Sequence, residues 1–156
     1  MVYLLISAFT VGLGFLIHEM GHKFVAQKYG CFAEFRANMR MLVLAVMMSF
    51  LGFVFVAPGA VYIHGNLDHK KNGKIAAAGP LMNIILAVIF LIIMLFFSKG
   101  IIVQYGFMIN SWLALFNMIP FMMFDGLKIL RWNKVVYGVM VGVCVIMVNL
   151  MSFLKL

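Results

Sequence analysis

Acidic side chains are almost missing from this chain. Only 4 of its 156 residues are Asp or Glu, and charged residues of both signs make up 10% of the sequence. A soluble globular domain carries about 25% charged residues. This scarcity, together with a hydrophobic fraction of 66%, argues against a soluble domain. The surplus apolar surface needs lipid around it, so the sequence predicts an integral membrane protein in contact with the bilayer.

Cysteine, linker sequences and signal-peptide features are also scarce. Cys31 and Cys144 lie far apart without CxxC spacing, which argues against a disulfide framework and a zinc ribbon. No Pro/Ser-rich linker, long charge block or repeat divides the chain, so we expect residues 1–156 to form a single domain. The apolar start lacks a basic region and a cleavage site, and we expect it to be retained as a membrane span.

Basic residues, in contrast, are present in excess and give a net charge of +8 at pH 7. They do not favour nucleic-acid binding, because they lie in short clusters between apolar runs. This pattern is typical of cytoplasmic loops beside anionic lipid headgroups. The clusters are Lys23, Lys28, Arg36 and Arg40; Lys70, Lys71 and Lys74; and Lys128, Arg131 and Lys134.

Five apolar stretches indicate the membrane topology. They cover about residues 2–27, 41–63, 75–97, 101–124 and 135–154, and all but the second are close to the roughly 20 residues that one span needs. The second stretch is interrupted by Gly52 and by Pro58-Gly59. If it enters the membrane and returns, all three basic clusters share one side, which the positive-inside rule favours. The competing arrangement is one more tilted span with inverted topology.

The predicted fold is therefore an all-α polytopic membrane protein with four full transmembrane helices and a re-entrant helix/β element. Residues 58–64 join a Pro-Gly turn to β-prone side chains and are expected to form a short strand. The loops that carry the basic clusters would be cytoplasmic. We expect a multi-pass protein of the cell membrane with its functional site toward the cytoplasmic side.

The strongest chemical signal is the sequence H-E-M-G-H at residues 18–22, inside the first apolar stretch. On a helix, His18 and His22 lie one turn apart on the same face, so both imidazoles can reach one Zn²⁺. Glu19 is close enough to accept a proton from a water molecule at such a metal. The alternative, a pair of core histidines with polar partners, is weak in a membrane, where His and Glu are costly and usually functional.

A catalytic zinc site needs a third protein ligand, and the remaining acidic residues are Glu34, Asp68 and Asp125. The first two lie in basic loops, whereas Asp125 lies near the end of the fourth stretch, at the depth expected for His22. The sequence favours Asp125 as the ligand, within the helical bundle. The alternative is an ion pair of Asp125 with Lys128 or Arg131. His64 and His69 could substitute as ligands, although both belong to a polar turn.

Three motifs together carry a resemblance to a known family. H-E-M-G-H at 18–22, G-P-L-M-N at 79–83 and N-M-I-P-F-M-M-F-D-G at 117–126 resemble the site-2 protease family of intramembrane zinc metalloproteases. The resemblance implies one Zn²⁺ per chain on His18, His22 and Asp125, with Glu19 as general base. It also places Asn83 and Asn117 near the site, holding substrate or oxyanion; hydrogen bonding between helices explains these residues equally well.

The sequence also departs from the family pattern. Met122, Met123 and Phe124 precede the D-G pair where the family is often richer in Pro and Gly, so pocket shape and substrate preference are open. No PDZ-like or CBS-like domain is expected.

The predicted function is an intramembrane zinc endopeptidase that cleaves membrane-spanning or membrane-anchored proteins. Residues Pro58, Gly59 and Tyr62 would belong to a strand whose edge pairs with an extended substrate. A catalytically silent zinc-binding scaffold and an ion transporter are the alternatives. An intact Glu19 argues against the scaffold, because a structural zinc site needs no base, and the lack of repeated halves argues against the transporter.

Overall fold

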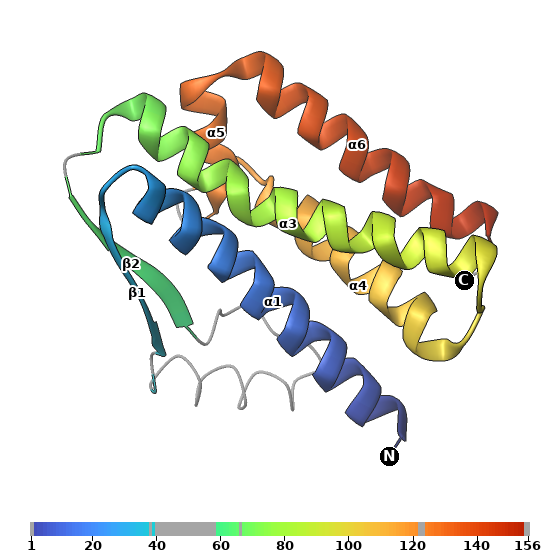
Figure 1. Ribbon diagram of the computed structural model, residues 1–156. Helices are drawn as coiled ribbons and strands as arrows, with labels where there is room; N and C mark the ends of the chain where they lie inside the picture. Colours follow the sequence, from blue (N-terminus) through green and yellow to red (C-terminus); the bar gives the residue numbers. More distant parts are fainter. Residues whose placement is uncertain (1, 38, 40–58, 66, 122–123, 155–156) are drawn as a thin grey trace.

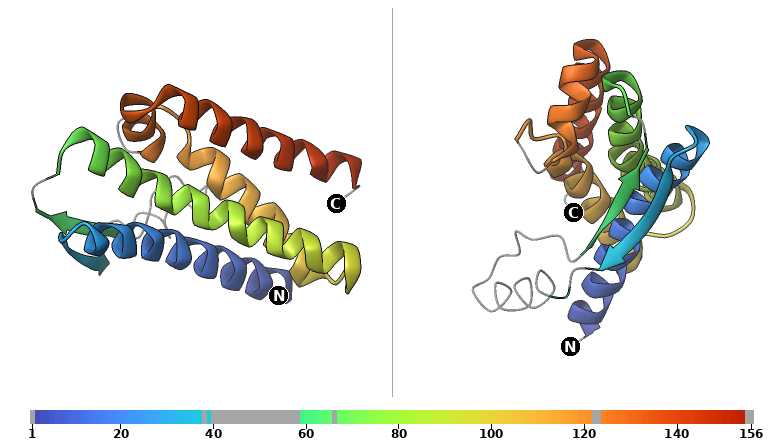
Figure 2. Two further views of the ribbon diagram at one scale, coloured as in Figure 1. Left: turned by 45° about the horizontal axis from the view of Figure 1, so that its top comes forward. Right: turned by 90° about the vertical axis from the view of Figure 1, so that its left-hand side faces the viewer.

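The computed structural model describes residues 2–37, 39, 59–65, 67–121 and 124–154. Within these residues the chain forms five α-helices and one two-stranded antiparallel sheet, in the order α1, β1, β2, α3, α4, α5, α6 (Figure 1). The helices lie side by side in a bundle, and the sheet runs beside the second half of α1 (Figure 2).

Helix α1 (Val2–Lys28) leads directly into the sheet. Gly30 follows the helix with φ +75°, a left-handed conformation that glycine adopts at little cost. The amides of Gly30 and Cys31 donate to the carbonyls of Gln27 and Ala26, a hydrogen-bond pattern typical of a helix C-terminus. The chain therefore reverses after α1 and enters β1 (Phe32–Ala37).

Strand β2 (Gly59–His64) pairs with β1 in antiparallel register, with Phe35 opposite Val61. The strand expected at residues 58–64 is thus present from Gly59, while its partner β1 lies in a segment for which no strand was predicted. Val61 and Ile63 pack against a small buried cluster that includes Ala26 and Ile75, which fixes the sheet against α1 and α3.

Helix α3 (His69–Phe96) is the centre of the bundle and packs against α1, α4 and α5. It begins at an N-cap, Asp68, whose carboxylate accepts a hydrogen bond from the Lys71 amide. Half of its ten buried residues are glycine or alanine, among them Gly73 and Gly79, and Asn83 is buried on the same helix. Small residues let neighbouring helices approach closely, so α3 can hold α1 and α5 near one another.

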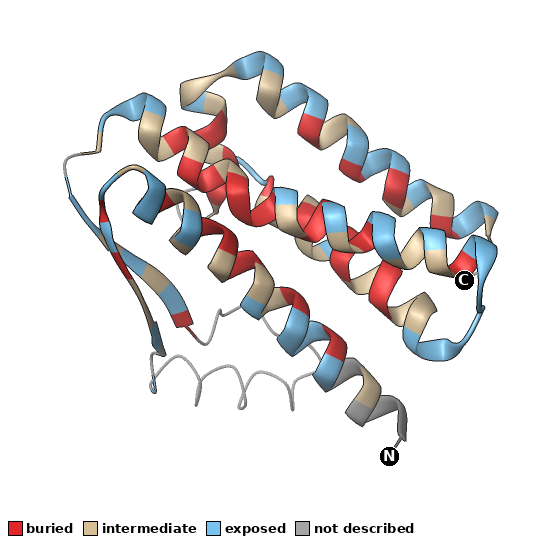
Figure 3. Cartoon of the chain, viewed as in Figure 1, coloured by how far each residue is buried: buried red, intermediate tan, exposed pale blue. Residues whose placement is uncertain are grey.

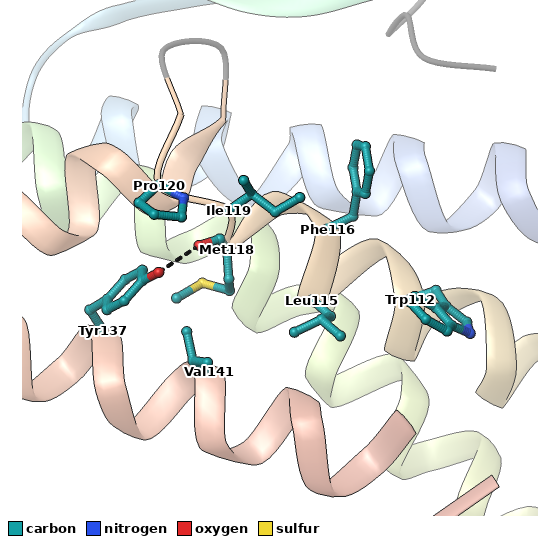
Figure 4. Close-up of a pocket in the computed structure, with 8 residues that line it drawn as sticks. All are labelled: Trp112, Leu115, Phe116, Met118, Ile119, Pro120, Tyr137 and Val141. Atoms are coloured by element: carbon teal, nitrogen blue, oxygen red, sulfur yellow. Dashed lines mark hydrogen bonds between the residues drawn. The ribbon is translucent and has the colours of Figure 1, made fainter. Parts of the chain in front are cut away.

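The remaining helices close the other side of the bundle. Helix α4 (Ile101–Asn117) and the short α5 (Asp125–Trp132) are followed by α6 (Lys134–Phe153). The larger core cluster joins α3, α4, α5 and α6, with Phe107, Met118 and Ile129 among its most deeply buried members (Figure 3). A pocket of about 370 Å³ between α4 and α6 is lined mainly by apolar side chains, and Tyr137 Oη donates to the Met118 carbonyl beside it (Figure 4).

The expectation of an all-α protein with four full transmembrane helices is wrong. Only α3 and α6 are long and apolar enough to cross a membrane among the described residues, and a two-stranded sheet is present. The predicted span 101–124 ends as a helix at Asn117, because the chain turns before Pro120 and restarts at Asp125. The predicted span 2–27 carries His18, Glu19, His22 and Lys23 in its second half. The proposed re-entrant path of residues 41–57, and Pro58, lie outside the described residues.

The described members of the basic clusters gather mainly at one end of the bundle. Helix α1 ends there, α3 and α6 begin there, and α5 lies between them (Figure 1). Lys99 lies at the opposite end, in the connection between α3 and α4. The basic residues placed at the first end by these elements are Lys28, Lys70, Lys71, Lys74, Lys128, Arg131 and Lys134.

Candidate metal centre

The two histidines of the H-E-x-x-H motif face the interior of the bundle from α1. Each exposes less than a tenth of its surface, at 4% for His18 and 8% for His22. Their Nε2 atoms are 3.1 Å apart, and their rings meet edge to face at a centroid distance of 4.7 Å. This is the arrangement that one helical turn between the two residues predicts.

Asp125 reaches the same point from the first turn of α5. Its Oδ2 lies 3.3 Å from His18 Nε2 and 3.0 Å from His22 Nε2. Ligand atoms about 2.0–2.2 Å from a tetrahedral Zn²⁺ are about 3.3 Å from one another, so the three donor atoms are spaced like one face of a zinc tetrahedron. Two nitrogens and one carboxylate oxygen also leave a fourth position open, as catalytic zinc sites require.

Gly79 leaves the space that an ion at this position needs. A Cβ atom built on Gly79 would lie 2.4 Å from His22 Nε2 and 2.5 Å from both His18 Nε2 and His22 Cε1, against the edges of both rings. Any other residue at this position would fill the cradle between the histidines and α3. The side-chain donors and the room between them therefore both fit a zinc ion.

The outer nitrogens of both rings are held by acceptors from α3. His18 Nδ1 lies 2.6 Å from Asn83 Oδ1, and His22 Nδ1 lies 2.8 Å from the Ile75 carbonyl oxygen. A carbonyl oxygen can only accept, so a neutral His22 must carry its proton on Nδ1 and present a lone pair on Nε2. Such partners on the far side of the ring orient metal-binding histidines and fix their tautomer.

Charge around Asp125 favours its ionised form. Burial alone would raise the pKa of Asp125, but hydrogen bonds from the His18 and His22 rings when these are protonated, together with the charge of Lys128, hold that pKa below its ordinary value. Lys128 Nζ lies 3.4 Å from Oδ1, the oxygen that does not face the histidines. The ion pair with Lys128 and the contact with the histidines therefore occur together, on different oxygens.

Glu19 lies beside the histidine pair and is 8% exposed. Its Oε2 accepts a hydrogen bond from the Val61 amide at 2.9 Å. In an antiparallel pair, amides alternate between facing the partner strand and facing away. Because the Val61 amide reaches Glu19, it points away from β1, and the outer edge of β2 is therefore turned toward the candidate site.

The other residues singled out from the sequence are placed differently. Asn117 is half-buried at the end of α4, where its Nδ2 donates to the Leu113 carbonyl. Gly59 opens β2, and Tyr62 is 45% exposed with its ring beneath the Arg36 guanidinium. His64 and His69 are exposed and do not join the cluster of donor atoms.

Sequence reasoning missed three residues at this site. Gly79 belongs to the G-P-L-M-N motif and lies four residues before Asn83, so helical spacing could have placed both on the face toward the histidines. Asn110 lies with Ser111 in the middle of an otherwise apolar part of α4, and a polar pair in such a segment is a signal that could have been used. Nothing in the sequence pointed to the Val61 amide, because a hydrogen bond from the main chain leaves no mark on the residue type.

Comparison with known proteins gives two relatives, both from Methanocaldococcus jannaschii. The protein named "Putative zinc metalloprotease MJ0611" is 46% identical over 141 residues, which cover 86% of this chain and 74% of the relative. "Zinc metalloprotease MJ0392" is 31% identical over 120 residues, which cover 74% of this chain but 30% of the relative. No protein-family model and no solved structure matches the chain. With its donor atoms arranged for one metal ion, and with this degree of identity to MJ0611, the chain belongs to a family of zinc metalloproteases.

Proposed function

We propose that this protein is a zinc-dependent endopeptidase that hydrolyses membrane-spanning or membrane-anchored proteins, as site-2 proteases do. The observation that carries the proposal is the convergence of His18, His22 and Asp125 beside Glu19 and against α3. Helix α3 is one of the two helices among the described residues that are long and apolar enough to cross a membrane. A hydrolytic site packed against such a helix would meet its substrate at the bilayer.

In this proposal, three residues would bind the metal ion and a fourth would transfer the proton. When bound, Zn²⁺ supplies Lewis acidity, which lowers the pKa of water and polarises a carbonyl group. His18, His22 and Asp125 would hold the ion through Nε2, Nε2 and Oδ2. Glu19 accepts a proton from the attacking water and passes it to the leaving amine.

The outer edge of β2, which faces the candidate site, favours a substrate that binds in an extended conformation. A helix hides its carbonyl groups, so a membrane segment must unwind before hydrolysis. The Val61 amide on this edge is already bonded to Glu19, and the amides of Gly59 and Ile63, two residues to either side, face the same edge because amides alternate along the strand. An extended peptide could pair with this edge through main-chain hydrogen bonds. Replacing Ile63 with Pro removes one donor of this edge, leaves the Val61–Glu19 hydrogen bond in place, and should slow cleavage while zinc is retained; normal cleavage would rule out pairing at this edge.

Charge distribution supports an orientation in the membrane. With α3 and α6 as spans, the end of the bundle that gathers most of the basic residues would face the cytoplasm, and the site would lie toward that side of the cell membrane. Single cysteines introduced at Lys28, Lys70 and Lys134 should label from the cytoplasmic side, and one at Lys99 from the other. Labelling of Lys70 and Lys99 from the same side would contradict this orientation.

The decisive experiment combines metal analysis with cleavage of a membrane substrate. Wild type should contain one Zn²⁺ per chain, and His22→Ala and Asp125→Ala should lose it. Glu19→Gln should retain zinc and the fold but lose at least about 100-fold in activity, because the amide cannot accept the proton. Zinc retained with wild-type cleavage by Glu19→Gln would refute the mechanism.

The two alternatives give different results in the same preparation. A zinc-binding scaffold would bind the metal but show no cleavage even as wild type. A transporter would show ion flux that does not depend on Glu19.

A further inference from the structure

Two buried asparagines lie behind the candidate metal centre and take no part in the mechanism above. Asn83 on α3 and Asn110 on α4 expose 0% and 1% of their surface. Both sit in helices that are otherwise strongly apolar, where an amide side chain is costly unless each of its polar atoms is bonded. Their hydrogen bonds form one continuous chain that ends on His18.

The main chain fixes which way each amide points. Asn110 Nδ2 donates to the Gly106 carbonyl at 2.8 Å, so Asn110 Oδ1 must be the atom that faces Asn83. Asn83 Nδ2 then donates both to this oxygen at 3.0 Å and to the Gly14 carbonyl at 3.1 Å. Both carbonyl groups can only accept, so neither amide can be reversed without placing oxygen against oxygen.

This polarity has a consequence for His18. With its nitrogen committed to Gly14 and Asn110, Asn83 can offer only its oxygen to the imidazole, 2.6 Å away. His18 Nδ1 must therefore donate, and the lone pair of the neutral ring lies on Nε2, the atom that faces His22 and Asp125. The Gly106 carbonyl on α4 thus fixes the orientation of Asn110, Asn110 fixes that of Asn83, and Asn83 fixes which nitrogen of His18 carries the proton.

We propose that Asn83 and Asn110 are positioning residues that act in series, Asn110 orienting Asn83 and Asn83 holding His18 in the tautomer that binds zinc. The proposal rests on the zinc-binding part of the function proposed above and not on peptidase activity. A merely structural role, in which the asparagines join α1, α3 and α4, would affect stability but would not act on zinc in series.

The test is zinc affinity, measured by competition with a chromophoric chelator on the full chain in detergent. Asn83→Leu removes the acceptor and should weaken zinc binding about 10- to 100-fold, the usual effect of losing the partner of a metal-binding histidine. Asn110→Leu should weaken it by less, about 3- to 10-fold, because the Gly14 carbonyl still orients Asn83. Added to Asn83→Leu, the Asn110→Leu change should have no further effect on zinc, because the two residues act in series.

Two matched controls separate positioning from general damage. Asn149 makes the same kind of bond as Asn110, from Nδ2 to the carbonyl four residues earlier at 2.8 Å, but on the exposed surface of α6. Ser111, next to Asn110, is equally buried and donates to the Phe107 carbonyl. Asn149→Leu and Ser111→Ala should both bind zinc as wild type does.

Rescue and spectroscopy complete the test. Asn83→Asp keeps an oxygen for His18 Nδ1, and a proton on its other oxygen restores a donor toward the Gly14 carbonyl and Asn110, so this variant should bind zinc more tightly than Asn83→Leu, even if the leucine variant folds poorly. The visible spectrum of the Co²⁺-loaded protein should change in Asn83→Leu and return toward wild type in Asn83→Asp. Wild-type affinity and spectrum in Asn83→Leu, or full additivity with Asn110→Leu, would overturn the proposal. Loss of zinc in these variants with no cleavage by wild type would instead refute only the peptidase function.

Discussion

Within the described part of the chain, α3 and α6 are the helices long and apolar enough to cross a membrane, yet their contacts and their buried residues differ. Helix α3 packs against α1, α4 and α5, and its buried positions include Gly73, Gly79 and Asn83. Helix α6 packs against α4 and α5 along one stripe of four sulfur-containing residues, Met140, Cys144, Met147 and Met151. The glycines of α6 differ as well, because a Cβ at Gly138 or Gly142 would meet no atom within 4 Å.

The comparison shows that hydropathy and function are separate properties of these helices. Both pass the same test of length and apolarity. Helix α3 supports the candidate metal centre because Gly79 leaves room beside the two histidines and because the Asn83 side chain bonds to His18. Substitutions in α3 should therefore alter zinc binding, whereas matched substitutions in α6 should alter stability alone.

The largest effect is expected for Gly79→Ala. The added methyl group would lie within 2.5 Å of both histidine Nε2 atoms, so the rings must shift from the positions in which they face one ion with Asp125, and zinc affinity should fall at least about 100-fold. Elemental analysis of the purified protein measures this directly. Gly142→Ala, the same change on the open surface of α6, should leave zinc content unaltered. Full zinc content in Gly79→Ala would contradict the idea that the missing side chain at position 79 makes room for the metal site.

An intermediate effect is expected for Gly73→Ala. A Cβ here would lie 2.1 Å from Trp132 Cβ, so α5 must move away from α3. Overpacking of this kind costs about 1–3 kcal/mol of stability. Because Asp125 begins α5, zinc binding should weaken as well, by about 10-fold. Thermal unfolding and chelator competition measure the two effects, with Gly138→Ala as the control. A stability loss without any change in zinc affinity would show that α5 positions Asp125 independently of α3.

The smallest effect on zinc is expected for Met147→Ala in α6. This side chain is 5% exposed, and truncating a buried methionine costs about 2 kcal/mol or more. Zinc affinity should not change, since no donor atom or partner of a donor atom comes from α6. Thermal unfolding should show the loss, and Ile146→Ala, at a position 68% exposed, should show little. A weaker zinc site in Met147→Ala would mean that α6 also supports the centre.

The features that depend only on neighbouring residues in the sequence could be predicted. His18 and His22 share a helix face because of helical geometry alone, and Gly59–His64 is a strand because its residues favour extended backbone. Asp125 was found by elimination, as few acidic residues were available. The donor atoms of all three predicted ligands lie together in the structure.

What could not be predicted depends on contacts between segments distant in sequence. Strand β1 was missed because its sequence, F-A-E-F-R-A, becomes a strand by pairing with residues 59–64. Four full spans were overestimated because the count treated 101–124 as one helix, whereas the chain leaves the helix at Asn117. The direction of the Asn83 amide follows from carbonyl groups on α1 and α4, which composition and periodicity do not report.

The hydrogen-bond partners of the two histidines differ in how easily a mutation can remove them. His22 is held by the carbonyl oxygen of Ile75, and all twenty amino acids supply that oxygen, so no substitution can delete the acceptor itself. His18 is held by the side chain of Asn83, which a single-nucleotide change can remove. In a saturation library, position 83 should therefore tolerate few residues because of hydrogen bonding, and position 75 should be restricted only by the packing of its side chain. The partner of His22 is therefore retained whatever residue occupies position 75, whereas the partner of His18 depends on the codon for Asn83.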